Sequence, residues 1–378
     1  MDSKKVISVK APDWSWLSQY FTPSLIAARP YKLDAPSGIT IKLDQNESPW
    51  DWPAALKEKI VRKLVLEDWN RYPDAMALDV TQGLAKYLGV NADCILTSSG
   101  SNHLITIILE GLAKQLPEGG RLVIARPSFP LFESHAQYLG IPYETWNLDE
   151  NFQYKVERLP KLTDGSLVIF ASPNNPTGNS LAKKDLRDLL RAYPKVLFLA
   201  DEAYFEFDDD PYTDLLAEFG NLIILRTLSK TMGAAGVRLG YLLGSPELIA
   251  NLGKLRVPFL FNHFTLAAAD TIFNDPEMRD FMNRNIENAR SERERMFKGL
   301  TEITKGKGIE IFNSKANFLL LRWKEQDACQ KAYQGLMALG IQVRNISAGL
   351  GLQGCLRVTI GLPTENDAFV AAIRESSK

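Results

Sequence analysis

Short apolar runs alternate with helical patterns through the middle of the chain, which predicts a mostly parallel α/β sheet. The expected strands are Ile95 to Thr97, Leu122 to Ala125, Leu167 to Phe170, Val196 to Ala200, Leu222 to Leu225 and, as an added strand, Leu239 to Leu243. Helical stretches such as Leu104 to Gln115 and Ala182 to Arg191 lie between them. The pattern therefore predicts a central sheet with helices on both faces.

The pattern changes after about Thr265, where a long charged helix is expected from Pro276 to Leu300. Short strands then follow at Ile309 to Phe312, Phe318 to Arg322, Gln342 to Arg344 and Leu356 to Ile360. We therefore expect a large domain over residues 46–265 and a smaller α+β domain over residues 266–378. Residues 1–45 are too few for a domain, and we expect this N-terminal segment to lie across another part of the structure or a partner subunit.

Composition narrows the class of protein. The 378 residues are 45% hydrophobic and 24% charged, with a formal net charge of −1, so nothing favours binding to nucleic acid or to an acidic membrane. No apolar stretch approaches the roughly 20 residues that span a bilayer, and the first residues lack an apolar signal core. Cys94, Cys329 and Cys355 read as reduced thiols, and the three histidines show no metal-ligand spacing. We expect a cytoplasmic protein without a metal.

Lys230 is the most informative residue. It follows the expected strand Leu222 to Leu225 and lies among hydroxyls and glycines, with Arg238 eight residues further on. A lysine on a tight loop beside phosphate donors is what a Schiff base to pyridoxal phosphate requires. A lone lysine is usually a solvated loop residue, but further segments of this chain suit the same cofactor.

Asp201 ends the apolar run Val196 to Ala200, and Tyr204 follows three residues later. A buried carboxylate needs a partner, and against the pyridine nitrogen it would keep that nitrogen protonated, making the ring an electron sink. The alternative is an N-cap of a following helix. The Tyr204 hydroxyl could point at the phenolic oxygen of the cofactor, although a lone tyrosine is more often an ordinary half-buried side chain.

Ser172 to Gly178 follows the strand Leu167 to Phe170, and its two prolines and glycine predict a rigid loop. Asn175 in that loop could donate to the phenolic oxygen, whereas a plain turn is the alternative. Ser98 to Asn102 lies between a strand and a helix, where small residues and the helix N-terminus suit a phosphate, although Ser and Asn also cap many helices.

Together with Thr227, Ser229 and Arg238, this turn makes a plausible phosphate cup. Phe129 could stack on a planar ring or belong to the core. Arg357 lies between apolar neighbours and needs a carboxylate, either internal or on a substrate, and the sequence leaves that choice open. All of these polar residues except Arg357 follow the carboxyl ends of expected strands, where ligands of open α/β sheets bind.

Together these segments resemble fold-type I pyridoxal-phosphate aminotransferases and, more narrowly, histidinol-phosphate aminotransferases. The matching segments cover nearly the whole chain: Arg29-Pro30-Tyr31, Asn46 to Pro49, Arg71 to Asp74, Ser172 to Gly178, Asp201 to Tyr204, Ser229-Lys230, Ser314 to Phe318 and Leu356 to Gly361. The chain departs from the family pattern at Asn102-His103, often Asp-Glu, and at Pro258 to His263.

The resemblance implies a role for each matching residue. Lys230 would be the Schiff-base lysine, Asp201 the pyridinium partner, and Asn175 and Tyr204 the contacts of the phenolic oxygen. The remaining cofactor contacts would be Phe129 on the ring and Ser101, Asn102, Thr227, Ser229 and Arg238 around the phosphate. Tyr72 would reach that phosphate from the other subunit of a homodimer. Tyr31, Asn46, Arg344 and Arg357 would line the substrate end, the two arginines facing a substrate phosphate.

The resemblance implies transfer of an amino group from histidinol phosphate to 2-oxoglutarate. Three alternatives stay open. An aromatic or other amino acid could be the donor. A decarboxylase of phosphorylated amino acids would keep Lys230, Asp201, Asn175 and Arg238, since only the bond that breaks differs. A cofactor-sensing regulatory protein would usually append a DNA-binding domain, and the stretch before Asn46 is too short and too weakly basic for one.

Overall fold

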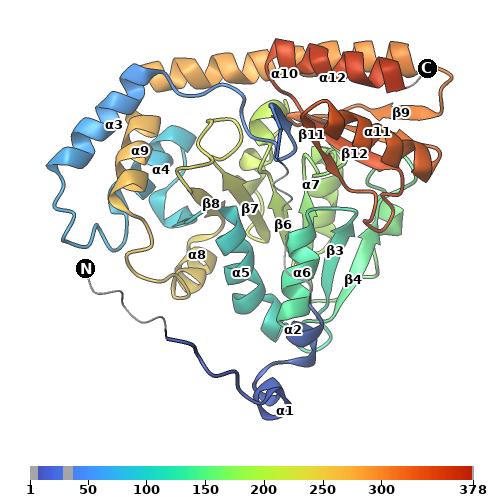
Figure 1. The fold of residues 1–378 in the computed structure, drawn as a ribbon. Coiled ribbons are helices and arrows are strands. Elements are labelled where there is room, and N and C mark those ends of the chain that lie inside the picture. Colours follow the sequence, from blue (N-terminus) through green and yellow to red (C-terminus); the bar gives the residue numbers. More distant parts are fainter. Residues whose placement is uncertain (1–6, 29–36, 377–378) are drawn as a thin grey trace.

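A seven-stranded sheet forms the centre of the larger domain in the computed structural model, which describes residues 7–28 and 37–376 (Figure 1). The strand order is β2-β8-β7-β6-β5-β3-β4, and only β8 runs antiparallel to its neighbours. The strands are β2 (Ile95–Ser98), β3 (Leu122–Arg126), β4 (Tyr143–Asn147), β5 (Leu167–Ala171), β6 (Leu197–Asp201), β7 (Leu222–Thr227) and β8 (Gly240–Leu243). The expected mostly parallel sheet is confirmed.

Helices cover both faces of this sheet because successive strand residues point to opposite sides. Leu199, Ile223 and Leu225 pack toward one face, and Phe198, Ala200 and Ile224 pack toward the other. The first face is covered by α5 (Ser101–Gly111), α6 (Pro130–Tyr138) and α8 (Pro246–Gly253). The second is covered by α3 (Ala54–Leu66), α4 (Leu78–Leu88), α7 (Lys183–Ala192) and α9 (His263–Asn274). The central strands β5, β6 and β7 are therefore buried on both sides.

The smaller domain holds a five-stranded sheet in the order β1-β11-β12-β10-β9, in which only β1 and β11 pair in parallel. Its elements are β1 (Ile41–Leu43), β9 (Ile309–Phe312), β10 (Phe318–Trp323), β11 (Ile341–Asn345), β12 (Cys355–Thr359), α11 (Gln326–Ala338) and α12 (Pro363–Ser376). Leu43 joins the core of this domain. The end of the N-terminal segment, residues 41–43, is thus an edge strand of the smaller domain.

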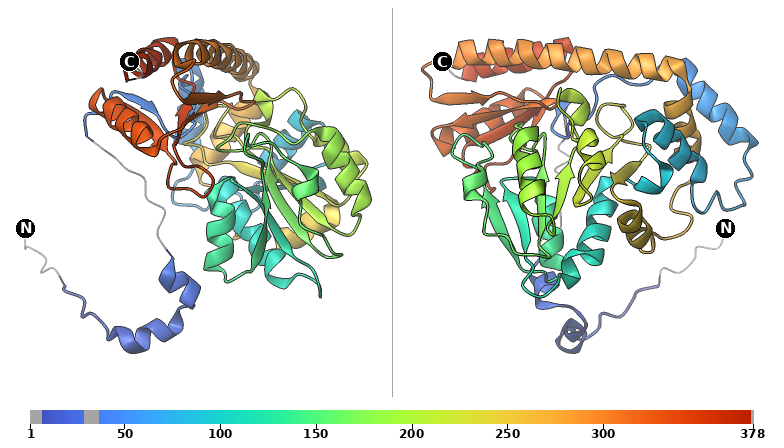
Figure 2. Two further views of the ribbon diagram at one scale, coloured as in Figure 1. Left: turned by 90° about the vertical axis from the view of Figure 1, so that its right-hand side faces the viewer. Right: turned by 180° about the vertical axis from the view of Figure 1, so that it is seen from behind.

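One long helix, α10 (Pro276–Thr304), runs along both domains (Figures 1 and 2). Met278 and Phe281 near its start join the core of the large domain, whereas Met296 and Leu300 join the core of the small one. The expected domain boundary at residue 265 falls inside α9, which packs on α3 and α4 of the large domain. The polypeptide therefore passes from the core of the large domain to that of the small domain within α10.

The described N-terminal residues 7–28 form two short helices, α1 (Trp14–Leu17) and α2 (Pro23–Ala27), and α2 packs on α6. Figure 2 shows the part of this segment that precedes α2, residues 7–20, reaching away from the body of the molecule. Single turns of 3-10 helix lie at Ser18–Tyr20, Ala92–Cys94, Ala113–Gln115, Val156–Arg158, Phe205–Phe207 and Thr213–Ala217. Among the helices of the described residues, none has the length and apolar character that crossing a membrane requires.

Candidate active site

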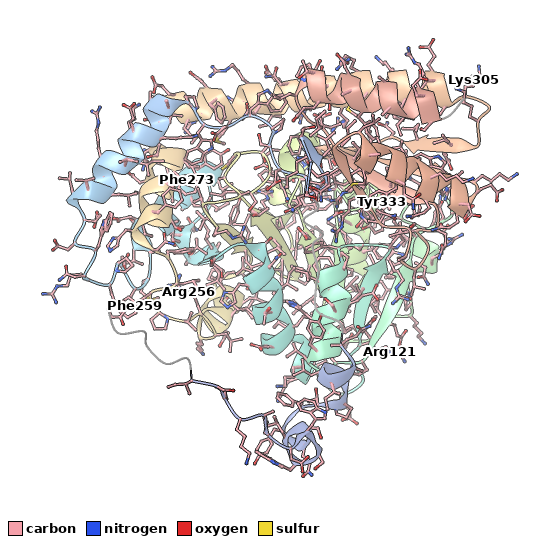
Figure 3. All side chains as sticks on the ribbon, in the orientation of Figure 1. Arg121, Arg256, Phe259, Phe273, Lys305 and Tyr333 are labelled. Atoms are coloured by element: carbon pink, nitrogen blue, oxygen red, sulfur yellow. The ribbon has the colours of Figure 1, made fainter. Side chains whose placement is uncertain are left out.

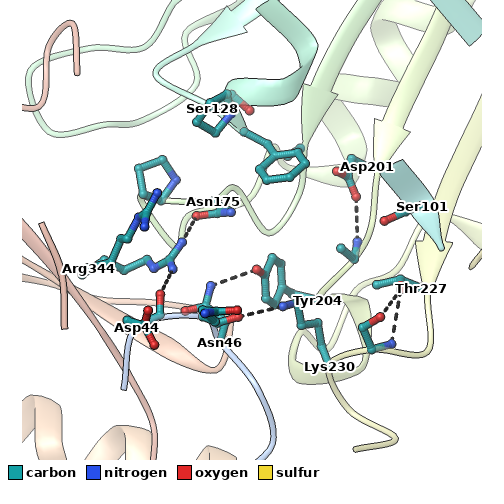
Figure 4. A pocket seen from close by; sticks show the side chains of 18 of the residues that line it. Asp44, Asn46, Ser101, Ser128, Asn175, Asp201, Tyr204, Thr227, Lys230 and Arg344 are labelled. Atoms are coloured by element: carbon teal, nitrogen blue, oxygen red, sulfur yellow. Dashed lines mark hydrogen bonds between the residues drawn. The ribbon is translucent and has the colours of Figure 1, made fainter. Parts of the chain in front are cut away.

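A pocket of about 820 Å³ opens at the carboxyl ends of the large-domain strands, facing the small domain. It gathers nearly all the predicted site residues (Figure 4). These are Asn46, Ser101, Asn102, Phe129, Asn175, Asp201, Tyr204, Thr227, Ser229, Lys230, Arg238, Arg344 and Arg357. Their positions span more than 300 residues of sequence, so the fold, and not local sequence, brings them together.

Two predicted residues are not in this pocket. Tyr72 is 80% exposed and stacks on Phe259, with ring centroids 4.5 Å apart, in a separate surface hollow. Its predicted place is the site of a partner subunit, and the single chain leaves that prediction open. Tyr31 lies outside the described residues.

Lys230 follows β7, and its half-buried side chain lines the pocket. The Nζ atom donates to the main-chain carbonyl of Gln45 at 2.9 Å. Burial, reinforced by the charges of Arg357 and Arg238 and opposed by that of Glu47, lowers the pKa of the Lys230 amine to about 8. A much larger share of this amine is neutral near neutral pH than in an exposed lysine, and a neutral amine is a nucleophile.

Asp201 is the last residue of β6, and it is 6% exposed. Its carboxylate accepts the Ala203 N–H at 3.0 Å. No α-helix begins after it, and the next turn of helix starts only at Phe205, so Asp201 is not a helix N-cap. Burial raises the pKa of Asp201 to about 7. No Lys or Arg of the described residues forms an ion pair with it, so this buried carboxylate is suited to a cation in the pocket.

The start of α5 and the loop after β7 enclose one end of the pocket. Helix α5 begins at Ser101, after Gly100 at φ +80°. A Cβ at Gly100 would lie 2.5 Å from the Arg238 guanidinium, so only glycine allows that guanidinium so close to the helix N-terminus. Thr227 and Ser229 complete this end, and the Thr227 hydroxyl bonds the Ser229 main-chain N–H at 3.2 Å. Hydroxyls, a helix N-terminus and an arginine together suit a phosphate.

The loop after β5 is tied to the loop after β3 by Asn174. Its Nδ2 donates to the Pro127 carbonyl at 2.9 Å, and its Oδ1 accepts from the Ser128 hydroxyl at 2.7 Å. Residues 172–178 are therefore more than a plain turn, since this link holds Asn175 and Phe129 on the same pocket. Phe129 is half-buried, lines the pocket and makes an edge contact with Phe132 at 5.8 Å between ring centroids.

Arg344 and Arg357 come from neighbouring strands of the small domain, β11 and β12, and lie directly opposite each other in the ladder. Arg357 donates to the Asn175 side-chain oxygen at 2.5 Å and to the Asp44 main-chain carbonyl at 2.6 Å. Like charges opposite each other in a sheet repel. Two adjacent cations that line one pocket therefore favour an anion there.

The sequence did not predict the hydrogen bonds that the main chain just before Glu47 makes with residues of the pocket. Asp44 and Gln45 offer main-chain carbonyls to Arg357 and Lys230, and no side-chain pattern reports a carbonyl contact. Asn174 was also missed, although its place beside Asn175, between two prolines, was a usable signal. Asn46 lines the pocket, but its side chain is bonded to Tyr204 and Thr359.

Comparison with known proteins gives a consistent result. The family model for "Aminotransferase class I and II" matches residues 3–373. The histidinol-phosphate aminotransferase of Chlorobium phaeovibrioides is 35% identical over 362 residues, which is 94% of this chain and 97% of that protein. The histidinol-phosphate aminotransferase of Aquifex aeolicus is 34% identical over 343 residues, 90% of this chain and 93% of that protein.

Solved structures agree on the fold. The histidinol-phosphate aminotransferase of Sinorhizobium meliloti, solved in complex with pyridoxal-5'-phosphate, superposes with a TM-score of 0.80 at 23% identity. The match covers 94% of this chain and 97% of that one. This likeness shows a shared fold over both domains.

Proposed function

The chain belongs to the class I and II aminotransferases, and on that premise we propose that it transfers the amino group of histidinol phosphate to 2-oxoglutarate with pyridoxal phosphate as cofactor. One observation carries the proposal. A half-buried lysine with a lowered pKa and a buried carboxylate that forms no ion pair within residues 7–28 and 37–376 share a pocket with a cup of phosphate donors. The curated relatives of similar length supply the substrate.

The residues of the pocket fit the cofactor by their own chemistry. The Asp201 carboxylate is suited to a protonated ring nitrogen. Ser101, Asn102, Thr227, Ser229 and Arg238 would hold the phosphate, Phe129 would face the ring, and Asn175 and Tyr204 would contact the phenolic oxygen. Lys230 would carry the aldehyde carbon.

When bound, pyridoxal phosphate supplies an electron sink that stabilises negative charge at the substrate α-carbon. Asp201 would keep that sink strong by holding a proton on the ring nitrogen. The Lys230 amine would take and return the proton at the α-carbon of the donor.

Arg344 and Arg357 suit the phosphate of the donor. Both line the pocket from the small domain, and the guanidinium groups offer forked donors that match phosphate geometry. Histidinol phosphate has no α-carboxylate, so its phosphate would take the place that a carboxylate takes in amino-acid donors. We also propose a cytoplasmic location, which the free thiols of Cys94, Cys329 and Cys355 support.

A homodimer completes this proposal. Exposed apolar side chains gather on α3 and on the two loops at residues 67–77 and 254–262: Val61, Val65, Leu66, Trp69, Tyr72, Met76, Leu255, Val257 and Phe259. Figure 3 labels Phe259 at this side of the large domain. A patch of this kind marks a protein interface, and a second copy would place its Tyr72 at the phosphate end of the neighbouring pocket.

Mixing Lys230→Ala protein with Tyr72→Ala protein is expected to restore activity. In a hybrid dimer one site carries both substitutions and the other carries neither. Random subunit exchange makes about half of the dimers hybrid, so about a quarter of wild-type activity should return. The measurement is the transaminase rate after exchange, verified with two differently tagged chains. If verified hybrids are no more active than the mean of the two parents, Tyr72 is not shared between subunits.

The capture of pyridoxal phosphate by the cofactor-free protein is expected to depend on pH with a midpoint near the pKa of Lys230, about 8. Burial lowers this pKa, so the neutral amine is half-populated at about pH 8, whereas an ordinary lysine reaches that point near pH 10.4. The capture rate, followed by absorbance, should therefore rise with pH and level off above about 8. Lys230→Ala, as the control, should show no such phase. A rate still rising tenfold per unit above pH 9 would contradict the assignment.

A donor panel tests the substrate directly. With 2-oxoglutarate as acceptor, kcat/KM for histidinol phosphate is expected to exceed that for histidinol by about one to four decades, since each charge-assisted arginine–phosphate bond contributes roughly 1.5–3 kcal/mol. Arg344→Gln should reduce this ratio by one to two decades and leave the histidinol rate nearly unchanged. A preference for phenylalanine would assign Arg357 to an α-carboxylate, and carbon dioxide release from a phosphorylated amino acid without amino transfer would indicate a decarboxylase.

A further inference from the structure

Three consecutive residues each hold one functional group of the pocket. The Asp44 carbonyl accepts from Arg357 at 2.6 Å, and the Gln45 carbonyl accepts from Lys230 at 2.9 Å. Asn46 Nδ2 bonds the Tyr204 hydroxyl at 2.9 Å. Residues 44–46, called here the 44–46 segment, therefore touch groups from β12, from the loop after β7 and from the loop after β6 (Figure 4).

The small domain fixes the position of this segment. It continues directly from β1, which pairs with β11 of the small sheet. The Asn46 main-chain N–H donates to the Thr359 hydroxyl at 2.9 Å, and Asn317 Nδ2 donates to the Asn46 carbonyl at 3.1 Å. Asn46 itself has a left-handed backbone, φ 53°, a conformation that asparagine and glycine tolerate best. The main chain at Asn46 is thus held by contacts that do not involve the pocket.

The same network fixes the direction of the bond to Tyr204. The Thr359 hydroxyl accepts the Asn46 N–H at 2.9 Å and donates its own proton to Asn46 Oδ1, 3.1 Å away. Oδ1 therefore faces Thr359, and Nδ2 must face Tyr204. Asn46 is the donor in that bond, and the Tyr204 hydroxyl is the acceptor. Accepting a hydrogen bond makes a hydroxyl a stronger donor.

We propose that Asn46 is a positioning residue that acts through Tyr204, and that it does not bind the substrate. Its side chain is 1% exposed, and its amide is directed at the protein, with Nδ2 bonded to Tyr204 and Oδ1 to Thr359. Through the hydrogen bonds from Thr359 to Asn46 and from Asn46 to Tyr204, the small domain fixes where the Tyr204 hydroxyl lies. That hydroxyl would donate to the phenolic oxygen of the cofactor. This inference rests on the proposed function.

The test is a pH titration of the visible absorption of the cofactor bound to Lys230, without substrate. A donor to the phenolic oxygen stabilises its anion and lowers the pH at which the absorption changes. Asn46→Gly keeps the left-handed backbone and removes only the amide, so the midpoint should rise by about one pH unit, which is about tenfold in proton affinity. Tyr204→Phe should raise it at least as much. In the double variant, loss of Asn46 should add nothing further, since its effect passes through Tyr204.

Thr359, whose hydroxyl bonds only Asn46 among the described residues, supplies a matched pair of controls. Thr359→Val keeps the shape but loses the hydroxyl and should raise the midpoint, whereas Thr359→Ser should leave it unchanged. The cofactor dissociation constant should stay within about threefold in Asn46→Gly and in both Thr359 variants, because the phosphate end is untouched. The inference would be overturned if Asn46→Gly left the midpoint unchanged, or if it shifted the midpoint as much in Tyr204→Phe protein as in wild type. Either result would leave the proposed function standing. A wild-type protein with no absorption dependent on Lys230 would overturn the proposed function, and this inference with it.

Discussion

Replacing Lys230 by alanine is expected to abolish turnover at the level that a sensitive assay detects, with the fold intact. Lys230 is the only lysine among the described residues that line the pocket. Its replacement removes both the group that would attach the cofactor and the group that would carry the proton. Loss of general acid–base catalysis alone costs typically two to four decades, and loss of the covalent step adds to this.

The variant should still bind pyridoxal phosphate through Ser101, Thr227, Ser229 and Arg238, because these groups do not depend on Lys230. Equilibrium dialysis should therefore find the cofactor, while the absorption of the lysine-bound form is missing. Lys184→Ala, on the exposed face of α7 with a side chain 83% exposed, is the control and should match wild type in both assays. Full transaminase turnover by Lys230→Ala would remove the lysine from the mechanism.

Replacing Asp201 by asparagine is expected to lower kcat by about two to four decades, equivalent to roughly 3–5 kcal/mol for a buried charge that has lost its partner. A neutral amide cannot hold a proton on the ring nitrogen, so the electron sink weakens. The local turn should survive, because the asparagine oxygen can still accept the Ala203 N–H. Folding is checked by thermal unfolding, and kcat by glutamate formation. If kcat of the variant lies within tenfold of the wild-type value, Asp201 only accepts the Ala203 N–H and does not support the electron sink.

The central strands could be predicted from the sequence because they are buried on both faces and read as continuous apolar runs. Leu222 to Leu225 lies within β7, and Leu167 to Phe170 within β5. Strand β4 was missed because its sequence, Tyr143–Asn147, is largely polar, as suits an edge strand paired only with β3. Strand β1 has three residues, and it is defined by pairing with β11 some 300 residues away, which no local pattern reports.

Helix ends were less predictable than helix positions. The charged helix expected to end at Leu300 continues to Thr304, because Thr304 bonds the Leu300 carbonyl and is buried under the small domain. The helix expected over Leu104 to Gln115 begins earlier, at Ser101, and is interrupted after Gly111 before a 3-10 turn. Such ends depend on tertiary contacts.

The site was predictable where side chains follow strand ends, as Asp201 and Lys230 do. Its electrostatics were not, because the raised pKa of Asp201 and the lowered pKa of Lys230 result from burial that only the fold determines. Asn46 was expected at the substrate end; it lines the pocket, and the structure adds that its side chain is bonded to Tyr204 and Thr359. A residue's type and neighbours in sequence do not reveal which of its atoms already have partners.

The central claim is that this pocket moves an amino group from histidinol phosphate to 2-oxoglutarate. The most direct measurement supplies the protein and pyridoxal phosphate with ¹⁵N-labelled histidinol phosphate and unlabelled 2-oxoglutarate, and follows the label by mass spectrometry. The account predicts labelled glutamate, formed in equal amount to the ketone product and absent with Lys230→Ala. Unlabelled glutamate only, or none at all from protein that carries the lysine-bound cofactor, would contradict it.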